Sequence, residues 1–230
     1  MTLNELYELA KEIPEYLKYE NKYAWLGYNN IIDVRYLDVD DILRVKTPIN
    51  NFINEHGSVL LLPNIVNGHV VDLLVRALDS PQMINYREVN LPYNIGNLKD
   101  FKYGDPLFIV EGPADVAGLK LVDPNIAVVA LKTNDINKDA YQVYKSLTNK
   151  IVLVLDSDKA GQLQLVKMRL NLKELGISTY TINQFGYLKD TGEIAEITMS
   201  YEKSKNTELL IELNNINLYY KAQIKLIKMS

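Results

Sequence analysis

Short apolar runs alternate with amphipathic stretches along the second half of the chain. The apolar runs have the length of strands, and a helical pattern follows each of the first three. Strands are predicted at 107–110, 126–131, 151–155 and 178–182, and helices at 113–121, 138–147 and 160–175. Continuous Val, Ile and Leu runs are typical of parallel strands that are covered on both faces. Because strand–helix alternation requires crossover connections, the pattern predicts an α/β fold with a parallel sheet.

The first half of the chain has a mixed pattern with helix and hairpin signals. Thr2 and Glu5 have the spacing of a capping box at the start of an amphipathic helix, expected over 2–18. Two apolar runs flank Asn67-Gly68, a dipeptide favoured in two-residue turns because both positions need positive φ. An antiparallel hairpin is therefore predicted between Val59 and Leu78.

A loop of turn-forming residues separates the two patterns. It contains Pro92, Asn94 and Gly96, a composition typical of a joint between domains. We therefore expect an N-terminal α+β subdomain over 1–100, an α/β domain over 101–200 and a C-terminal helical tail over 201–230. In the tail, two groups of apolar residues at helical spacing predict two short helices.

Composition restricts the possible classes of protein. The chain has 230 residues, of which 47% are hydrophobic, enough for a packed core. It has no cysteine and two histidines, which excludes disulfides and a zinc site of its own. No run approaches the ~18 apolar residues of a membrane span and the first residues lack a signal-peptide pattern, so we expect a cytoplasmic protein. The net charge of −4 argues against a passive coat for nucleic acid, but not against an enzyme that uses bound metal.

Acidic residues follow the predicted strands at three places. Glu111 ends the first run, Asp156 and Asp158 follow the third, and the segment KDTGE at 189–193 comes after the fourth. The carboxyl ends of neighbouring parallel strands meet at one edge of a sheet, so these carboxylates are expected to lie together. Crowding raises the pKa of each carboxyl group unless a cation neutralises them, and Mg²⁺ prefers oxygen ligands. A single acidic pair after a strand is more often a helix cap, but the three together predict a metal-dependent site acting on phosphates.

The three acidic motifs resemble those of a known family. EGPAD at 111–115, DSDKAG at 156–161 and KDTGE at 189–193, in this order, are similar to the toprim domain of DnaG-type primases, type IA and II topoisomerases and some nucleases. The upstream hairpin, which ends near Arg76, also resembles the segment preceding the toprim domain of bacterial primases. The resemblance implies a toprim parallel sheet flanked by helices, preceded by a small α+β subdomain with a β-hairpin and followed by short C-terminal helices.

Features that the chain lacks narrow the function within this family. It has no G-x-x-x-x-G-K-[ST] phosphate loop, no cysteine cluster like that of the recombination-repair proteins, and little room for a strand-passage gate. The resemblance therefore favours a primase core, which synthesises short RNA primers on single-stranded DNA by Mg-dependent nucleotidyl transfer, and it suits a phage or mobile-element protein. Two alternatives stay open: a toprim nuclease, and a non-catalytic toprim module that binds a replication protein.

By this resemblance the acidic residues have distinct roles. Asp156 and Asp158 are expected to bind metal directly, with Asp190 or Glu193 contributing. Glu111 is either a further ligand or the group that takes the hydroxyl proton. Two Mg²⁺ (or Mn²⁺) ions are expected, one to help activate the primer 3′-hydroxyl and one to hold the triphosphate and stabilise the departing pyrophosphate.

Supporting and basic residues complete the expected site. Asp115, four residues after Glu111, is expected to support that glutamate or to bind metal through water. Arg76 and Arg87 are expected to face the acidic site and bind phosphate or template. Lys159 and Lys189 flank the acids and are candidates for phosphate contacts. Each basic residue also has an ordinary interpretation, as a surface charge that balances its neighbours.

The expected partners follow from the same resemblance. They are a single-stranded DNA template, ribonucleoside triphosphates, a replicative helicase and a separate zinc-binding module, with no membrane. Two positions depart from the bacterial primase pattern: Gly192 stands where another acid is usual, and Gln162 follows Gly161 where arginine is frequent. The third motif is therefore one carboxylate short.

Overall fold

The chain divides into two compact units, Met1–Leu91 and Pro92–Ser230. The computed structural model describes residues 1–229 except 43–46, 88, 90, 99–100 and 132–137. The division falls at the first residue of the loop that was expected to be a joint, and not at residue 100. The helices beyond residue 200 belong to the second unit, so the segment that was expected as a separate tail is part of the same unit as the parallel sheet.

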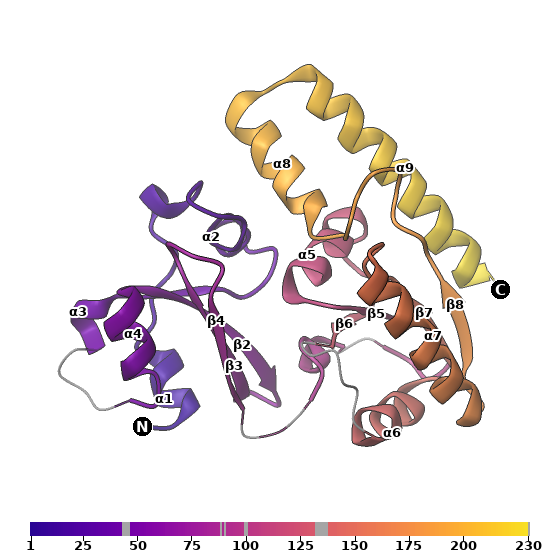
Figure 1. Ribbon diagram of the computed structural model, residues 1–230, viewed down its shortest axis with the longest axis horizontal. Helices are drawn as coiled ribbons and strands as arrows, with labels where there is room; N and C mark the ends of the chain where they lie inside the picture. Colours follow the sequence, from indigo (N-terminus) through magenta and orange to yellow (C-terminus); the bar gives the residue numbers. More distant parts are fainter. Residues whose placement is uncertain (43–46, 88, 90, 99–100, 132–137, 230) are drawn as a thin grey trace. The chain divides into compact units, whose positions relative to one another are not determined.

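The first unit is built on an antiparallel sheet with strand order β1-β2-β3-β4 (Figure 1). Its strands are β1 (Arg35–Leu37), β2 (Val59–Val66), β3 (His69–Ala77) and β4 (Met83–Arg87). β2 and β3 form the predicted hairpin, in which Val66 pairs with His69 and the turn residues Asn67 and Gly68 have φ of 52° and 80°. The positive φ at both turn positions is the reason why the Asn-Gly dipeptide locates this turn in the sequence.

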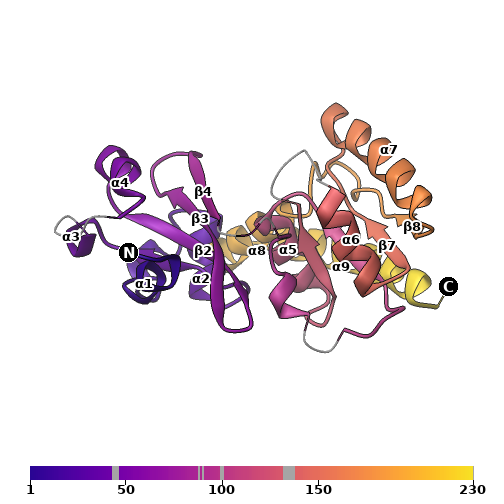
Figure 2. The same ribbon diagram turned by 90° about the horizontal axis from the view of Figure 1, so that it is seen from below.

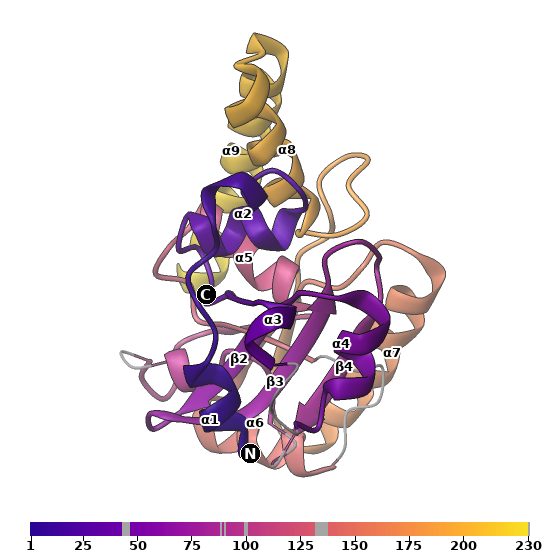
Figure 3. The ribbon, with the colours of Figure 1, turned by 90° about the vertical axis from the view of Figure 1, so that its left-hand side faces the viewer.

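Short helices cover one face of this sheet. These are α1 (Leu3–Glu8), α3 (Val39–Ile42) and α4 (Asn50–His56), which lie in front of β2 and β3 in Figure 3. Leu6, Ile42 and Ile53 are buried there together with residues of the strands. A further helix, α2 (Lys22–Tyr28), contributes the buried side chain of Trp25.

The first helix has the predicted capping box but is shorter than expected. The Glu5 N–H donates to Thr2 Oγ1 and the Thr2 N–H donates to the Glu5 carboxylate. Beyond the helix, Lys11 pairs with Tyr36 of β1, and a 3-10 turn, η1 (Glu15–Leu17), follows. Backbone pairing with the sheet therefore replaces the later turns of the helix predicted over 2–18.

The second unit is built on a parallel sheet with strand order β6-β5-β7-β8. Its strands are β5 (Leu107–Val110), β6 (Val128–Ala130), β7 (Lys150–Leu153) and β8 (Ser178–Thr181), and a 3-10 turn, η2 (Ile95–Asn97), precedes them. All three neighbouring pairs run parallel, which confirms the predicted α/β fold. Every residue of β5 is buried, as its continuous apolar sequence requires.

Helices follow the strands of the second unit (Figure 2). They are α5 (Pro113–Val122), α6 (Lys138–Leu147), α7 (Lys159–Glu174), α8 (Glu193–Ser204) and α9 (Thr207–Met229). Tyr144 of α6 and Met168 of α7 are buried with Ile109 and Leu153 of the central strands. α5 packs against β6 and α8, and α8 and α9 lie side by side.

The C-terminal segment forms one long helix, so the prediction of two short helices was wrong. No Pro or Gly interrupts α9, and its buried residues recur at helical spacing: Leu213, Ile216, Tyr220, Ile224 and Ile227. The Tyr220 hydroxyl donates to Gln184 Oε1 at 2.6 Å, which fixes α9 on the segment after β8. α8 was not anticipated and begins within the third acidic motif. Among the described helices, none has the length and apolar character that crossing a membrane requires.

Two glycines let backbone segments of the second unit approach closely. A Cβ at Gly118 on α5 would lie 1.8 Å from the carbonyl oxygen of Thr191. A Cβ at Gly161 on α7 would lie 2.4 Å from the carbonyl oxygen of Asp156. Both distances are far below van der Waals contact. The second and third acidic motifs can therefore pack on these helices only where the helices have no side chain.

Replacement of Gly118 by alanine should destabilise the protein, although alanine for glycine inside an ordinary helix stabilises by roughly 0.5–1 kcal/mol. The added methyl group must push α5 away from Thr191, and such overpacking costs about 1–3 kcal/mol or more. Urea unfolding followed by circular dichroism measures the change. The control is Gly112→Ala, whose Cβ would have its nearest neighbour at 3.5 Å and should cost about 1 kcal/mol or less. Equal stability of Gly118→Ala and the parent would contradict the close approach.

Candidate functional site

The first acidic motif forms the turn from β5 into α5. Glu111 follows the last residue of β5, Gly112 is the N-cap of α5, and Pro113 is its first residue. Asp115 turns back on this N-terminus, where its Oδ2 accepts a hydrogen bond from the Gly112 N–H at 2.8 Å. Asp115 is only 8% exposed, so the turn buries a carboxylate next to the end of a strand.

The second motif connects β7 to α7 and touches the first. Asp156 N–H donates to Glu111 Oε1 at 3.0 Å, so these two acidic residues, 45 positions apart, are in direct contact. Asp158 is the N-cap of α7, and its Oδ1 accepts from the Gly161 N–H at 2.9 Å. One oxygen of Asp158 therefore caps a helix N-terminus, which is the usual role of an isolated acid that follows a strand.

The third motif lies between β8 and α8 and bonds to both of the others. Its Lys189 carbonyl accepts from the Ser157 N–H of the second motif at 2.8 Å. Its Gly192 N–H donates to Asp115 Oδ1 at 2.8 Å, and the Thr191 hydroxyl donates to the Asp115 carbonyl oxygen at 3.2 Å. The three motifs thus form one hydrogen-bonded layer at the carboxyl ends of the parallel strands.

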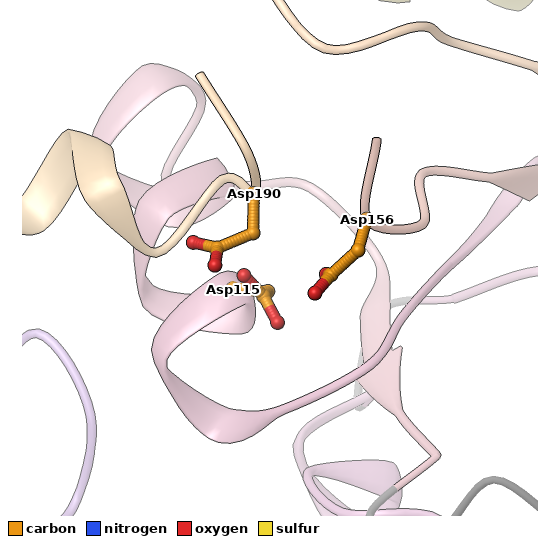
Figure 4. Close-up of side chains that lie close together, drawn as sticks. All are labelled: Asp115, Asp156 and Asp190. Carbon is orange, nitrogen blue, oxygen red and sulfur yellow. The ribbon is translucent and has the colours of Figure 1, made fainter. Parts of the chain in front are cut away.

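Three carboxylates converge in this layer. Asp115 from α5, Asp156 from the loop after β7 and Asp190 from the loop before α8 point toward one another (Figure 4). They offer ligand atoms that all lie within 4.8 Å of one another. Such a set of oxygen donors suits a divalent cation of the Mg²⁺ type.

The structure distributes the predicted metal ligands unevenly. Asp156 and Asp190 belong to this cluster, together with Asp115, for which only a supporting role was expected. Glu193 instead accepts the Lys189 N–H at 3.0 Å and so caps its own loop. The four-residue spacing predicted that Glu111 and Asp115 share one face of a helix, but Glu111 precedes the first residue of that helix. The cluster forms instead because the segment before α8 packs on α5, and α8 was not predicted from the sequence.

Burial and nearby negative charge raise the pKa values of three carboxyl groups of the site, those of Asp115, Asp156 and Glu111. Asp115 has its pKa raised to about 7, first by burial and then by the charge of Asp190, although the Gly112 and Gly192 N–H groups oppose the shift. Burial also raises the pKa of Asp156 and of Glu111. A protonated carboxyl group is favoured where no cation balances the charge.

Lys189 supplies positive charge to the outer part of the site. Its Nζ lies 3.2 Å from Asp156 Oδ2 and 3.3 Å from Asp158 Oδ2. These contacts, first with Asp156, raise the pKa of Lys189 to about 12. The Gly161 N–H, with Lys189, holds the pKa of Asp158 below its usual range. Lys159, the first residue of α7, is exposed and has no ion pair within the described part of the chain.

The two predicted arginines lie in the first unit. The Arg76 guanidinium on β3 stacks over the Tyr23 ring at 4.5 Å, and its Nη1 donates to the Pro81 carbonyl at 3.5 Å. Arg87 is exposed on β4, opposite Asp72 in the sheet register. Their binding of phosphate or template stays a prediction.

Gly192, the position noted as lacking an acid, packs directly on the cluster. A Cβ there would lie 3.0 Å from Asp190 Oδ1 and 3.2 Å from Asp115 Oδ1. The glycine therefore lets the backbone N–H reach Asp115 without crowding the two carboxylates.

Part of the chain matches a known family model, and the fold resembles several solved structures. Residues 108–194 match the family model described as Toprim-like. A DnaG primase catalytic domain bound to ssDNA has a TM-score of 0.63 at 15% identity, covering 95% of this chain and 80% of that chain. The E. coli primase catalytic core has a TM-score of 0.56 at 17% identity, covering 84% of this chain and 67% of that chain. The primase fragment of the bacteriophage T7 primase-helicase protein has a TM-score of 0.52 at 15% identity, covering 77% of this chain and 68% of that chain.

The comparisons confirm the resemblance seen in the sequence. The segment from 108 to 194 is a toprim-like domain, and the chain as a whole has the fold of primase catalytic cores. At 15–17% identity the structural likeness establishes the fold. No curated protein sequence matches the chain significantly.

The raised pKa of Asp115 predicts that the protein without metal loses stability as the pH rises. The folded state holds the Asp115 proton up to about pH 7, whereas the usual value is 3.8, so its stabilising contribution is complete below about pH 4 and is lost through pH 7. The shift corresponds to an effect on the order of a few kcal/mol. Melting temperatures in EDTA between pH 4 and 8 should therefore fall more steeply for the parent than for Asp115→Asn, which cannot titrate. Parallel profiles of the two proteins would contradict the assignment.

Proposed function

We propose that this chain is the catalytic core of a DNA primase, which joins ribonucleotides into short RNA primers on a single-stranded DNA template. The observation that carries the proposal is the convergence of Asp115, Asp156 and Asp190 within 4.8 Å at the carboxyl edge of a toprim sheet. The fold of primase catalytic cores across nearly the whole chain supports it.

The residues of the cluster fit a divalent cation. Asp115, Asp156 and Asp190 offer carboxylate oxygens, which Mg²⁺ and Mn²⁺ prefer. Burial is the main cause of the raised pKa values of Asp115 and Asp156, and the negative charge of Asp190, which a bound cation would offset, adds to it. A cation held there would polarise phosphate oxygens and help ionise the attacking 3′-hydroxyl.

Other residues of the chain then have separate tasks in nucleotidyl transfer. Glu111 is half-buried, and its raised pKa suits a group that takes the proton of the 3′-hydroxyl. As O3′ bonds to the α-phosphorus, the bond from the α-phosphorus to the bridging oxygen breaks and pyrophosphate leaves. Lys159, which is exposed next to Asp158, is proposed to contact phosphate, and Arg76 and Arg87 are proposed to bind template or triphosphate.

The proposed partners are single-stranded DNA, ribonucleoside triphosphates, a replicative helicase and a separate zinc-binding module. One similar structure is a primase domain bound to ssDNA, and another is a fragment of a primase-helicase protein. These likenesses support the first and third partners.

Neutralising either of two acids should abolish primer synthesis while leaving the fold intact. Asp156→Ala removes a carboxylate from the cluster, and Glu111→Gln keeps an oxygen for the Asp156 N–H while removing the charge. We expect each rate to fall at least about 10²-fold. The measurement is the yield of labelled RNA on single-stranded DNA with Mg²⁺ and ribonucleotides, and melting temperatures within a few degrees of the parent serve as the control.

The same assay separates the alternatives. Cleavage of the DNA without ribonucleotides, lost in Asp156→Ala, would instead identify a toprim nuclease. A binding module would be indicated if the parent shows neither activity but captures a replication protein in a pull-down. The variant with Glu111, Asp156 and Asp158 all replaced should then capture it equally well. Full synthesis by both single variants would refute the catalytic roles.

A further inference from the structure

The Lys189 side chain lies between two acidic residues of the second motif. Its Nζ is 3.2 Å from Asp156 Oδ2 and 3.3 Å from Asp158 Oδ2. Its backbone is fixed to the same loop, because its carbonyl accepts from the Ser157 N–H at 2.8 Å and its N–H donates to Glu193 at 3.0 Å. The hydrogen bonds of the third motif therefore bring the ammonium to this position.

The inner and outer parts of the acidic site differ in their charge balance. Within the described residues, no basic side chain pairs with Asp115 or Asp190, the inner pair. In the outer part, Asp158 uses one oxygen to cap α7 and the other to bind Lys189. Asp156 belongs to both parts, since it takes part in the inner cluster and also binds Lys189.

We propose that Lys189 is a built-in counter-ion for the Asp156–Asp158 pair, so that the free protein binds a single divalent cation at Asp115, Asp156 and Asp190. This inference rests on the proposed metal-dependent function. Because the ammonium already occupies the space between the two outer carboxylates, a second divalent cation can enter only by displacing it. The Lys189 side chain is 52% exposed, so water is available to the displaced ammonium. The free protein then holds one ion and not the two that the sequence suggested.

The number of Mn²⁺ ions bound by the nucleotide-free protein tests this proposal. Electron paramagnetic resonance of unbound Mn²⁺ gives that number directly and needs no enzymatic activity. We expect one ion for the parent and two for Lys189→Met, in which Asp158 Oδ2 loses its cation. Where the outer site of the parent binds detectably at high Mn²⁺, its affinity should be at least roughly tenfold weaker than in Lys189→Met.

Three variants separate displacement from a general charge effect. Lys159→Met removes the same charge from the same region but breaks no ion pair with the acids, so it should still bind one ion. Lys189→Arg keeps a cation and should also bind one. Asp158→Asn combined with Lys189→Met should return to one ion, and asparagine still caps α7. Melting curves establish that each variant is folded, and Lys189→Gln replaces Lys189→Met if the latter is not.

The outcomes distinguish this inference from the proposed function. The counter-ion role is overturned if the parent binds two ions with similar affinity. It is also overturned if folded Lys189→Met and Lys189→Gln bind the same number of ions as the parent with the same affinity. Neither outcome contradicts the proposal of primer synthesis. Equal gains in Lys159→Met and Lys189→Met overturn it as well, because they show a general charge effect. A parent that binds no Mn²⁺ without nucleotide overturns the one-ion inference, and the primer-synthesis assay then decides the proposed function separately. Expected Mn²⁺ numbers in a protein without primer synthesis would refute only the primase activity.

Discussion

Hydrogen bonds from backbone N–H groups to carboxylates hold the acidic site together. Asp115 accepts from Gly112 at one oxygen and from Gly192 at the other, and Glu111 accepts from Asp156. These donors belong to the turns between strands and helices, so their positions are fixed by the fold and not by side-chain rotamers. Charge-assisted bonds of this kind are about twice as strong as neutral ones, and they keep groups together that repel one another.

The carboxylates that would bind a cation also lower the stability of the folded protein when no cation is bound. Asp115 is buried beside Asp190, and its raised pKa expresses the free energy that a charge at this position costs the folded protein. A cation that binds the folded state and not the unfolded chain returns stability by mass action. The close contact of Gly118 with Thr191 resists relaxation of the cluster, since the third motif lies directly on the backbone of α5.

Lys189 neutralises part of the negative charge on one side of the acidic site, at Asp156 and Asp158. The same residue that closes the third motif onto the second through its backbone also places its ammonium over Asp156 and Asp158. The outer carboxylates are therefore partly neutralised in the free protein, whereas no basic side chain among the described residues pairs with Asp115 or Asp190.

Features that depend on local rules could be predicted from the order of residues alone. Strand and helix periodicity gave the parallel sheet, Asn67-Gly68 gave the hairpin, and the capping box gave the start of α1. The sequence also placed Glu111 and Asp156 at one edge, because parallel strands have aligned ends. Three further features became apparent only in the folded protein: Gly192, just before α8, contacts Asp115, α9 is a single helix, and Lys189 lies between two aspartates. These outcomes depend on packing between segments distant in the chain, and no periodicity or short motif encodes which side chains such packing brings into contact.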